Sequence, residues 1–312
     1  MKEKIIILVG PTASGKTNVS IELAKKINAE IISADSMQIY KHMNIGTAKP
    51  TSHEMEGIVH YLIDEIDPAE EFSVALFRQL CEGYIEKIVS KGKKPLIVGG
   101  TGLYINSLVK PWNFSKTEPN RELRYELETI AKDKGKEHLH NMLRRVDPLS
   151  ADAIHPNNVK RVIRALEVFQ LSGMSKSESD QNSMREELTY EPIIMGIHVE
   201  RSILYDRIEK RIDSMLDAGL VEEVKALLGL GYKESLVSMQ GLGYKEIVKY
   251  LKGEYTYNEA VEILKRDTRH FAKRQLTWFR RDDRIKWFTV EDYENLELLQ
   301  VDMYTYLKNK GI

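Results

Sequence analysis

Short apolar runs alternate with amphipathic segments along the first hundred residues of the chain, and the same pattern returns after residue 192. The apolar runs predict strands at residues 4–9, 30–34, 59–63, 95–99 and 193–199. Apolar residues spaced three or four apart predict helices near 16–28, 73–91, 202–216, 220–229 and 259–281. Strands alternating with helices are typical of a parallel α/β sheet, which is therefore the expected fold class.

Between these two parts the pattern changes. From residue 113 to about residue 190 only helical periodicity is found, and it is rich in charge. A helix start lies at residues 155–158, His-Pro-Asn-Asn, where an asparagine can cap the helix that follows. Residues 173–187 are polar and predict a loop. We therefore expect an α/β core of residues 1–112 and 193–312, with an amphipathic helix near its end, interrupted by a helical insertion of residues 113–192.

Composition limits the class of protein further. The 312 residues are 42% hydrophobic and carry a formal net charge of −1, so a polyanionic partner would have to meet local basic surfaces. The single cysteine, Cys81, excludes intrachain disulfides and a cysteine-rich zinc site, and it fits a reducing compartment. No signal peptide and no apolar run of membrane-spanning length is visible. We expect a cytoplasmic monomer with no membrane contact and no obligate protein partner.

The most specific motif follows the first predicted strand. Residues 10–17 read Gly10, Pro11, Thr12, Ala13, Ser14, Gly15, Lys16 and Thr17, which is the G-x-x-x-x-G-K-[ST] phosphate loop. In such a loop the backbone amides and the helix N-terminus surround phosphate oxygens. Lys16 adds a positive charge, and the Thr17 hydroxyl is placed to ligate Mg²⁺. The motif refines the expected fold to a P-loop NTPase-like parallel sheet core with a helical insertion domain.

A second acidic residue, which P-loop ATPases use to hold Mg²⁺ at a strand end, is missing here. The strand at 95–99 runs into Gly100 and Thr101, whereas Asp35 closes the strand at 30–34. Because ligands bind beyond the carboxyl ends of parallel strands, Asp35, Thr101 and the phosphate loop should converge on one crevice. That set suits a nucleophilic transfer in which a phosphate group is attacked or departs. Asp35 could be a metal ligand, a general base or a structural cap, and we favour base or orienter.

The predicted helix at 259–281 is strongly basic, with seven Lys or Arg residues and one acid, Asp267, between residues 265 and 281. One stripe is expected to pack on the core: Val261, Leu264, Thr268, Phe271, Gln275 and Trp278. A separate face carries Arg266, Arg269, His270, Lys273, Thr277 and Arg280. This concentration suits contacts with a phosphate backbone, the alternative being a solvated helix face. A smaller basic group lies in the insertion at Lys160, Arg161 and Arg164.

Together these motifs resemble one family, the bacterial tRNA dimethylallyltransferases, also called tRNA isopentenyltransferases. The stretches that carry the resemblance are residues 10–17, 35–40, 46–50, 98–104, 155–157, 161–168, 241–244 and 268–280. One departure is Asn158, where many members have Asp, and a capping role survives that change.

The resemblance implies transfer of a dimethylallyl group from dimethylallyl diphosphate to N6 of adenine 37, beside the anticodon of a tRNA. Asp35 would orient the amine and accept its proton, and Thr101 would help to position the reacting groups. Lys16, the loop amides, Mg²⁺ on Thr17 and Arg207 would stabilise the departing diphosphate; a surface ion pair with Asp206 or Glu209 is the alternative for Arg207. The target adenine would be extruded from the anticodon stem-loop. The tRNA contacts so implied are Asp35, Ser36, Met37, Gln38, Lys160, Arg161, Arg164, Gln240, Gly243, Tyr244, Lys273, Arg274 and Arg280.

Three other functions fit parts of the sequence. A small-molecule P-loop kinase would turn over ATP without RNA. An adenylate isopentenyltransferase would use free AMP or ATP as acceptor, but a mononucleotide requires neither the basic helix nor the insertion. A non-catalytic RNA-binding module would leave the phosphate loop, Asp35 and Thr101 without a purpose.

Overall fold

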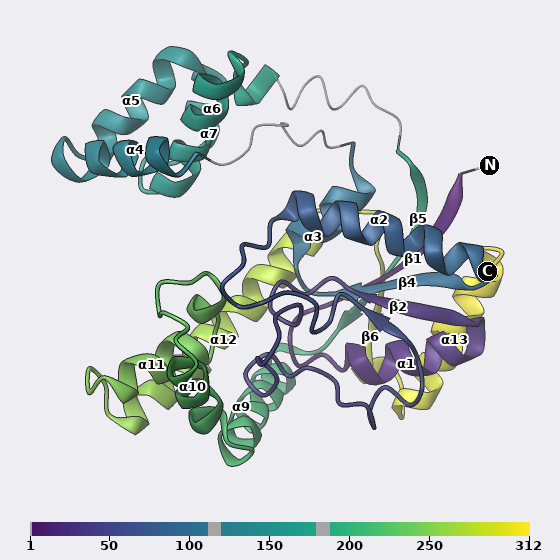
Figure 1. The fold of residues 1–312 in the computed structure, drawn as a ribbon. Helices are drawn as coiled ribbons and strands as arrows, with labels where there is room; N and C mark the ends of the chain where they lie inside the picture. Colours follow the sequence, from purple (N-terminus) through teal and green to yellow (C-terminus); the bar gives the residue numbers. More distant parts are fainter. Residues whose placement is uncertain (1, 112–119, 179–187) are drawn as a thin grey trace. The chain divides into compact units, whose positions relative to one another are not determined.

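The computed structural model describes residues 2–111, 120–178 and 188–312, and it divides the chain into two compact units (Figure 1). The first, the sheet unit, comprises Met1–Ser107 and Thr189–Ile312, and the second, the helical unit, comprises Leu108–Leu188. Part of the expected insertion, residues 113–119 and 179–187, lies outside the described residues. That part includes most of the polar loop predicted at 173–187.

The sheet unit is built on six parallel strands in the order β3-β2-β4-β1-β5-β6. The strands are β1 Glu3–Val9, β2 Ala29–Ser33, β3 His60–Tyr61, β4 Lys94–Gly99, β5 Tyr190–His198 and β6 Lys286–Thr289. The central strand β1 is covered on both faces, and its residues from Ile5 to Val9 are fully buried. Burial on both faces explains why the central strands are continuous apolar runs. The parallel α/β core predicted from the sequence is confirmed.

The edge strand β6 is an addition to the five strands predicted from the sequence. It has only four residues and pairs with β5, with Met195 opposite Lys286. A strand so short, with an exposed lysine at its start, has no apolar run long enough to predict it.

Helices cover both faces of this sheet and extend beyond its carboxyl edge. Figure 1 shows α2 and α3 on one face and α1 with α13 on the other, while α9 to α12 gather beyond the ends of the strands. The flanking helices are α1 Lys16–Ile27, α2 Val74–Ser90, α3 Gly102–Val109 and α13 Leu296–Asn309. The helices at the carboxyl edge are α9 Arg201–Asp217, α10 Leu220–Gly229, α11 Tyr244–Leu251 and α12 Tyr257–Phe279.

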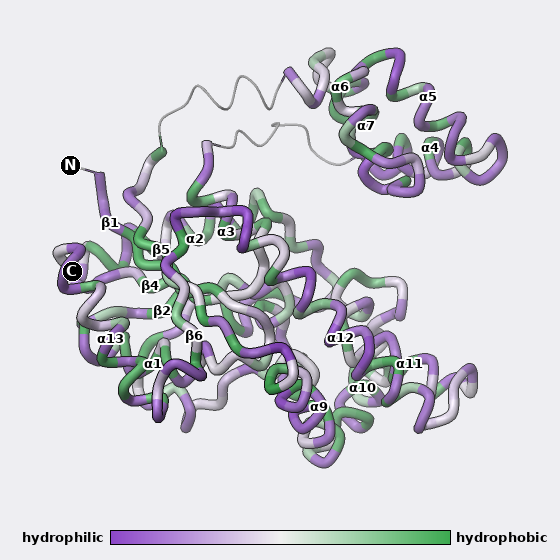
Figure 2. The backbone as a smooth tube through the Cα atoms, turned by 180° about the vertical axis from the view of Figure 1, so that it is seen from behind, coloured by the Kyte–Doolittle hydropathy of each residue, from purple (hydrophilic) through white to green (hydrophobic). Residues whose placement is uncertain are grey.

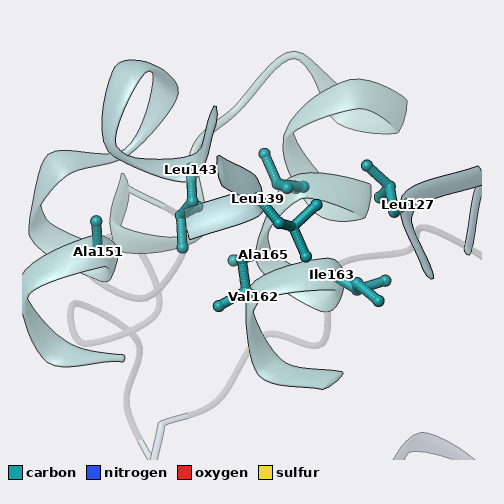
Figure 3. Close-up of a cluster of buried hydrophobic side chains, with 8 residues drawn as sticks. Leu127, Leu139, Leu143, Ala151, Val162, Ile163 and Ala165 are labelled. Carbon is teal, nitrogen blue, oxygen red and sulfur yellow. The ribbon is translucent and has the colours of Figure 1, made fainter. Parts of the chain in front are cut away.

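The helical unit has a core of its own. Its helices are α4 Arg121–Asp133, α5 Lys136–Val146, α6 Pro148–Ala153 and α7 Val159–Ser172. Figure 2 shows hydrophobic and hydrophilic stretches alternating along them, as expected for amphipathic helices around a small core. Leu139, Leu143 and Val162 are fully buried in that core, and Figure 3 shows their side chains converging from α5 and α7.

Truncating a leucine in this small core should destabilise the helical unit selectively. Leu143→Ala is expected to lower its opening free energy by about 3 kcal/mol, because the methyl groups lost leave a cavity. Hydrogen exchange of the α5 and α7 amides measures this, and exchange in β1 should stay unchanged. Leu149, which is 61% exposed, provides the matched control, and Leu149→Ala should shift exchange little. Equal effects of the two substitutions would contradict the assignment of this core.

Candidate functional site

The phosphate loop joins β1 to α1 with a backbone that turns its amides inward. Ala13 has φ +62° and Gly15 has φ +88°, both in the left-handed region. Left-handed residues among right-handed neighbours form the concave amide nest that binds anions. Glycine adopts this region at no steric cost, whereas for Ala13 it is strained, as residues at binding sites often are.

Lys16 opens α1 and folds back over the loop. Its Nζ donates hydrogen bonds to the carbonyl oxygens of Gly10, at 3.0 Å, and Pro11, at 2.7 Å. Burial, with the positive charge of Arg211, lowers the pKa of Lys16 to about 8, although Asp35 acts in the opposite direction. The amine is therefore buried beside a second positive charge, where a bound anion would be favoured.

A cavity of about 440 Å³, here called the anion cavity, lies along this loop. Its walls include residues 13–18 of the loop and four further charged side chains, Lys49, Glu54, Arg207 and Arg211. With Lys16 the cavity carries four basic groups against one acid, so it suits a polyanion. The Ser14 hydroxyl is buried and has no hydrogen-bond partner among the described residues, so it can donate to an anion bound at this loop.

A second cavity of about 330 Å³, here called the central cavity, is lined by Thr12, Asp35, Thr101 and Arg211 together with apolar residues of α9 and α12. Arg211 therefore lines both cavities. Asp35, Thr101 and Thr12 of the phosphate loop line the same cavity, as predicted from the strand ends. An anion in one cavity and a neutral group in the other would meet beside Arg211.

Asp35 caps its own turn, and Thr101 holds that turn from the neighbouring loop. One carboxylate oxygen of Asp35, Oδ1, accepts the amide of Met37 at 2.8 Å, and the amide of Gln38 lies at 3.4 Å. The Thr101 hydroxyl accepts the amide of Ser36 at 3.2 Å. Asp35 is thus a cap for this turn, a reading the sequence had left open, and it also faces the cavity. Its second oxygen, Oδ2, has no hydrogen-bond partner among the described residues, so the capping role leaves it available for chemistry.

Two arginines of α9, Arg207 and Arg211, differ in how the sequence indicated them. Arg207 lines the anion cavity, and its suggested partners are engaged elsewhere: Asp206 pairs with Lys210 and Glu209 with Arg269. Arg211, one turn later, was missed by sequence reasoning. Burial lowers the pKa of Arg211, while Asp35 and Glu54 oppose that shift. The i, i+4 spacing after Arg207 was the signal that could have identified it.

Helix α12 is more than a core helix with a basic face. Leu264, Thr268 and Phe271, from the stripe expected to pack on the core, line the central cavity. Part of the positive charge of α12 is neutralised by α9, because Lys265 pairs with Asp213 and Arg269 with Glu209.

The basic residues singled out for tRNA remain exposed on α12: Lys273, Arg274 and Arg280. None of the three has a carboxylate partner among the residues that the structure describes. Arg280 lies 3.3 Å from the Nε2 of His198.

The three predicted tRNA contacts of the helical unit differ in whether they are already paired. Lys160 and Arg161 are exposed on α7. Arg164 instead pairs with Glu167 at 2.5 Å, beside Arg124. Burial would raise the pKa of Glu167, but the hydrogen bonds from both arginines outweigh it and lower that pKa. Arg164 therefore has a structural partner that sequence reasoning did not foresee.

The remaining predicted tRNA contacts surround the central cavity, whose walls include Ser36, Met37, Gln240, Gly243 and Tyr244. Gln38 is not among the residues that line this cavity. Its amide nitrogen donates to the carbonyl of Ala48 at 3.2 Å, and its oxygen accepts the Ser33 hydroxyl at 3.1 Å.

Tyr244 is fully buried, and its hydroxyl donates to Glu223 at 2.7 Å. Glu223 also accepts the amides of Asn44, Ile45 and Gly46 at 2.8 to 3.1 Å. This carboxylate fixes the loop that forms one wall of the central cavity, and no local sequence signal indicated it, because its partners lie almost 180 residues away.

Two absences hold for the described residues. No described helix is long and apolar enough to cross a membrane. Residues 2–111, 120–178 and 188–312 contain no group of three or more His, Cys, Asp or Glu side chains that could hold a metal ion.

Comparisons with known proteins agree with this geometry. A family model described as IPP transferase matches residues 38–282. The chain is 53% identical over 310 residues to the tRNA dimethylallyltransferase of Acetivibrio thermocellus, covering 99% of both chains. It is 53% identical over 309 residues to that of Clostridioides difficile, covering 99% of this chain and 98% of the relative.

Solved structures of similar fold come from the same family. The tRNA isopentenylpyrophosphate transferase of Bacillus halodurans has a TM-score of 0.74 at 43% identity, covering 99% of this chain and 97% of that one. A eukaryotic dimethylallyltransferase described as acting on tRNA has a TM-score of 0.80 at 30% identity, covering 92% and 74%. The resemblance read from the motifs is confirmed.

The lowered pKa of Lys16 makes anion binding depend on pH. Because that pKa is about 8, the ammonium loses its proton as the pH rises through this value, and affinity for an anion falls. Calorimetry with inorganic pyrophosphate should show weaker binding at higher pH, with a dissociation constant several-fold larger at about pH 9 than at about pH 7. Lys16→Arg is the control, because a guanidinium stays charged throughout and the ionisation of pyrophosphate is common to both proteins. The same pH profile in both would rule Lys16 out as the cause.

Proposed function

The chain belongs to the IPP transferase family, and on that premise we propose that it transfers a dimethylallyl group from dimethylallyl diphosphate to N6 of adenine 37 in a tRNA, releasing diphosphate. The observation that carries the proposal is the junction of the two cavities at Arg211, with four basic groups on one side and Asp35 with Thr101 on the other. P-loop ATPases use a second acidic residue at a strand end to hold Mg²⁺, and this chain lacks one. Its phosphate loop therefore suits binding of a leaving group better than nucleotide hydrolysis.

In the proposed reaction the lone pair of the adenine N6 attacks C1 of the dimethylallyl group. The bond between C1 and the diphosphate oxygen breaks, and its electron pair leaves with the diphosphate. Lys16, the loop amides, Arg207 and Arg211 oppose the negative charge that accumulates there, and stabilisation of developing charge is commonly the largest catalytic contribution. Asp35 takes the N6 proton through the oxygen that does not cap Met37, and Thr101 fixes the turn on which Asp35 lies.

We propose Mg²⁺ as a cofactor of the diphosphate. The hydroxyls of Thr17 and Ser14 lie at the anion cavity and are hard oxygen donors of the kind that Mg²⁺ takes. With no carboxylate cluster in the described residues, the substrate and water would complete the ligand set. When bound, the ion would neutralise part of the charge of the diphosphate.

We assign the exposed cations of α12, Lys273, Arg274 and Arg280, to the tRNA backbone, together with Lys160 and Arg161 of the helical unit. Arg164 is the weakest of the proposed contacts, because Glu167 already holds it. Extruding a stacked adenine costs a few kcal/mol, which backbone contacts would offset. A tRNA substrate would place the reaction in the cytoplasm.

Labelled dimethylallyl diphosphate and an unmodified tRNA test the function directly. Wild-type protein should label the tRNA and should not label AMP, whereas brisk ATP turnover without tRNA would point to a kinase. Asp35→Asn should lower the transfer rate about 10²- to 10⁴-fold, because it removes the base. The asparagine oxygen still accepts the Met37 amide, so binding of tRNA and of pyrophosphate should change less than about two-fold. Near-normal turnover of Asp35→Asn would remove Asp35 from the mechanism.

Replacing Lys273 and Arg280 together by alanine should weaken tRNA binding and flatten its salt dependence. Each lost phosphate contact lowers the slope of log K against log salt concentration by a little under one, so the double variant should lose about one to two units. Fluorescence anisotropy with labelled tRNA at several salt concentrations measures this slope. The control replaces Lys265 and Arg266 of the same helix by alanine. Lys265 already pairs with Asp213, and Arg266 with Asp267. A salt slope of the Lys273 and Arg280 variant that is unchanged from wild type would make the basic face a solvated surface.

A further inference from the structure

Gln275 of α12 connects two loops that belong to different strands. Its Oε1 accepts the backbone amide of Thr12 in the phosphate loop at 2.9 Å. Its Nε2 donates to the carbonyl of Gly100, the residue before Thr101, at 3.0 Å. Gln275 is only 7% exposed; its bond to Gly100 is buried and its bond to Thr12 is partly buried. One planar amide thus spans the loop after β1 and the loop after β4.

The contact with the second loop is close. A Cβ on Gly100 would lie 2.2 Å from the Nε2 of Gln275, and a Cβ on Gly102 would lie 2.2 Å from the Cδ1 of Trp278. Such distances are not tolerated, so the backbone on either side of Thr101 lies directly against α12. Gln275 and Trp278, one turn apart on the helix, enclose Thr101 between them.

We infer that Gln275 is a positioning residue that sets the diphosphate-binding loop at a fixed distance from the loop of Thr101 and, through Thr101, from the turn that carries Asp35. The inference rests on the proposed function, in which the first loop holds the leaving group and Asp35 orients the attacking amine. Thr101 of the second loop holds the turn on which Asp35 lies. The reacting atoms must approach in line, and a misplacement of about 1 Å costs up to 10²-fold in rate. Glutamine suits this place because it offers an acceptor and a donor at once, which neither Leu nor ionised Glu does.

A structural role alone would be that Gln275 satisfies two buried backbone groups and affects only stability. The two roles differ in what they change. Thr12 lines the central cavity and the anion cavity is lined from Ala13 onward, so releasing the Thr12 amide adds no donor to the anion site. It loosens the loop, which must then be ordered when the anion binds.

The experiment compares Gln275→Leu, Gln275→Glu and a matched control, Gln300→Leu, which changes a buried glutamine on α13 that is 8% exposed. Tm is measured first for every variant. Three quantities are then measured well below the lowest Tm: the tRNA dissociation constant, the pyrophosphate dissociation constant, and the single-turnover transfer rate at saturating substrates. Gln275→Leu is expected to bind tRNA within two-fold of wild type, to bind pyrophosphate at least three-fold more weakly, and to lose at least ten-fold in transfer rate.

Gln275→Glu separates the two bonds. It keeps the acceptor for Thr12 but turns a carboxylate toward the carbonyl of Gly100 and adds negative charge near the diphosphate. Its transfer rate should also fall at least ten-fold, and its pyrophosphate binding should be weaker than that of Gln275→Leu. Gln300→Leu should lower Tm while leaving the rate and both affinities within two-fold.

Two failures are distinguishable. If wild-type protein transfers nothing from dimethylallyl diphosphate to tRNA, the proposed function is wrong, and pyrophosphate binding still tests the role of Gln275. If Gln275→Leu lowers Tm like Gln300→Leu but leaves pyrophosphate binding and the transfer rate unchanged, Gln275 is only a buried structural amide.

Discussion

The site depends on one constraint, the parallel pairing of β4 with both β1 and β2. Val9 lies opposite Gly99, and Ser33 lies opposite Val98, so the three strands end at the same level of the sheet. The phosphate loop, the Asp35 turn and the Thr101 loop must therefore begin side by side. Hydrogen bonds then adjust what the sheet has brought together: the amide of Thr101 donates to Ala34, and the amide of Ser36 to Thr101.

The charges around this edge are unevenly divided. Lys16, Arg207 and Arg211 face the anion cavity, while Asp35 faces the central cavity with apolar residues of α9 and α12 around it. The lowered pKa of Lys16 reflects first its burial and then the positive charge of Arg211 nearby. Such a division suits a reaction in which negative charge builds up on one side and a proton must be removed on the other. It gives the proposed prenyl transfer a physical basis that does not depend on the family.

Sequence reasoning predicted what is encoded locally. The apolar runs gave five of the strands, and the phosphate loop fixed the place of Lys16 and Thr17. The rule that ligands bind at carboxyl strand ends brought Asp35 and Thr101 to the same crevice. Contacts between distant segments were not predictable in this way. Arg211 needed knowledge of which face of α9 turns to the loop, and Glu223 needed its partners at residues 44–46. The pair of Arg164 with Glu167 is local, yet spacing alone does not tell a structural ion pair from a binding surface.

Helix α12 shows most clearly where a periodic pattern misleads. Its stripe was expected to be core because its spacing is helical, but two of its members, Thr268 and Gln275, are polar. A buried polar group in a packed stripe is costly unless something bonds to it. Gln275 meets that requirement with two backbone partners in loops of the site, whereas the Thr268 hydroxyl is buried beside the central cavity without a partner among the described residues. Polar residues within an apolar stripe therefore indicated that this face of the helix forms a wall of the site, a signal that the periodicity by itself concealed.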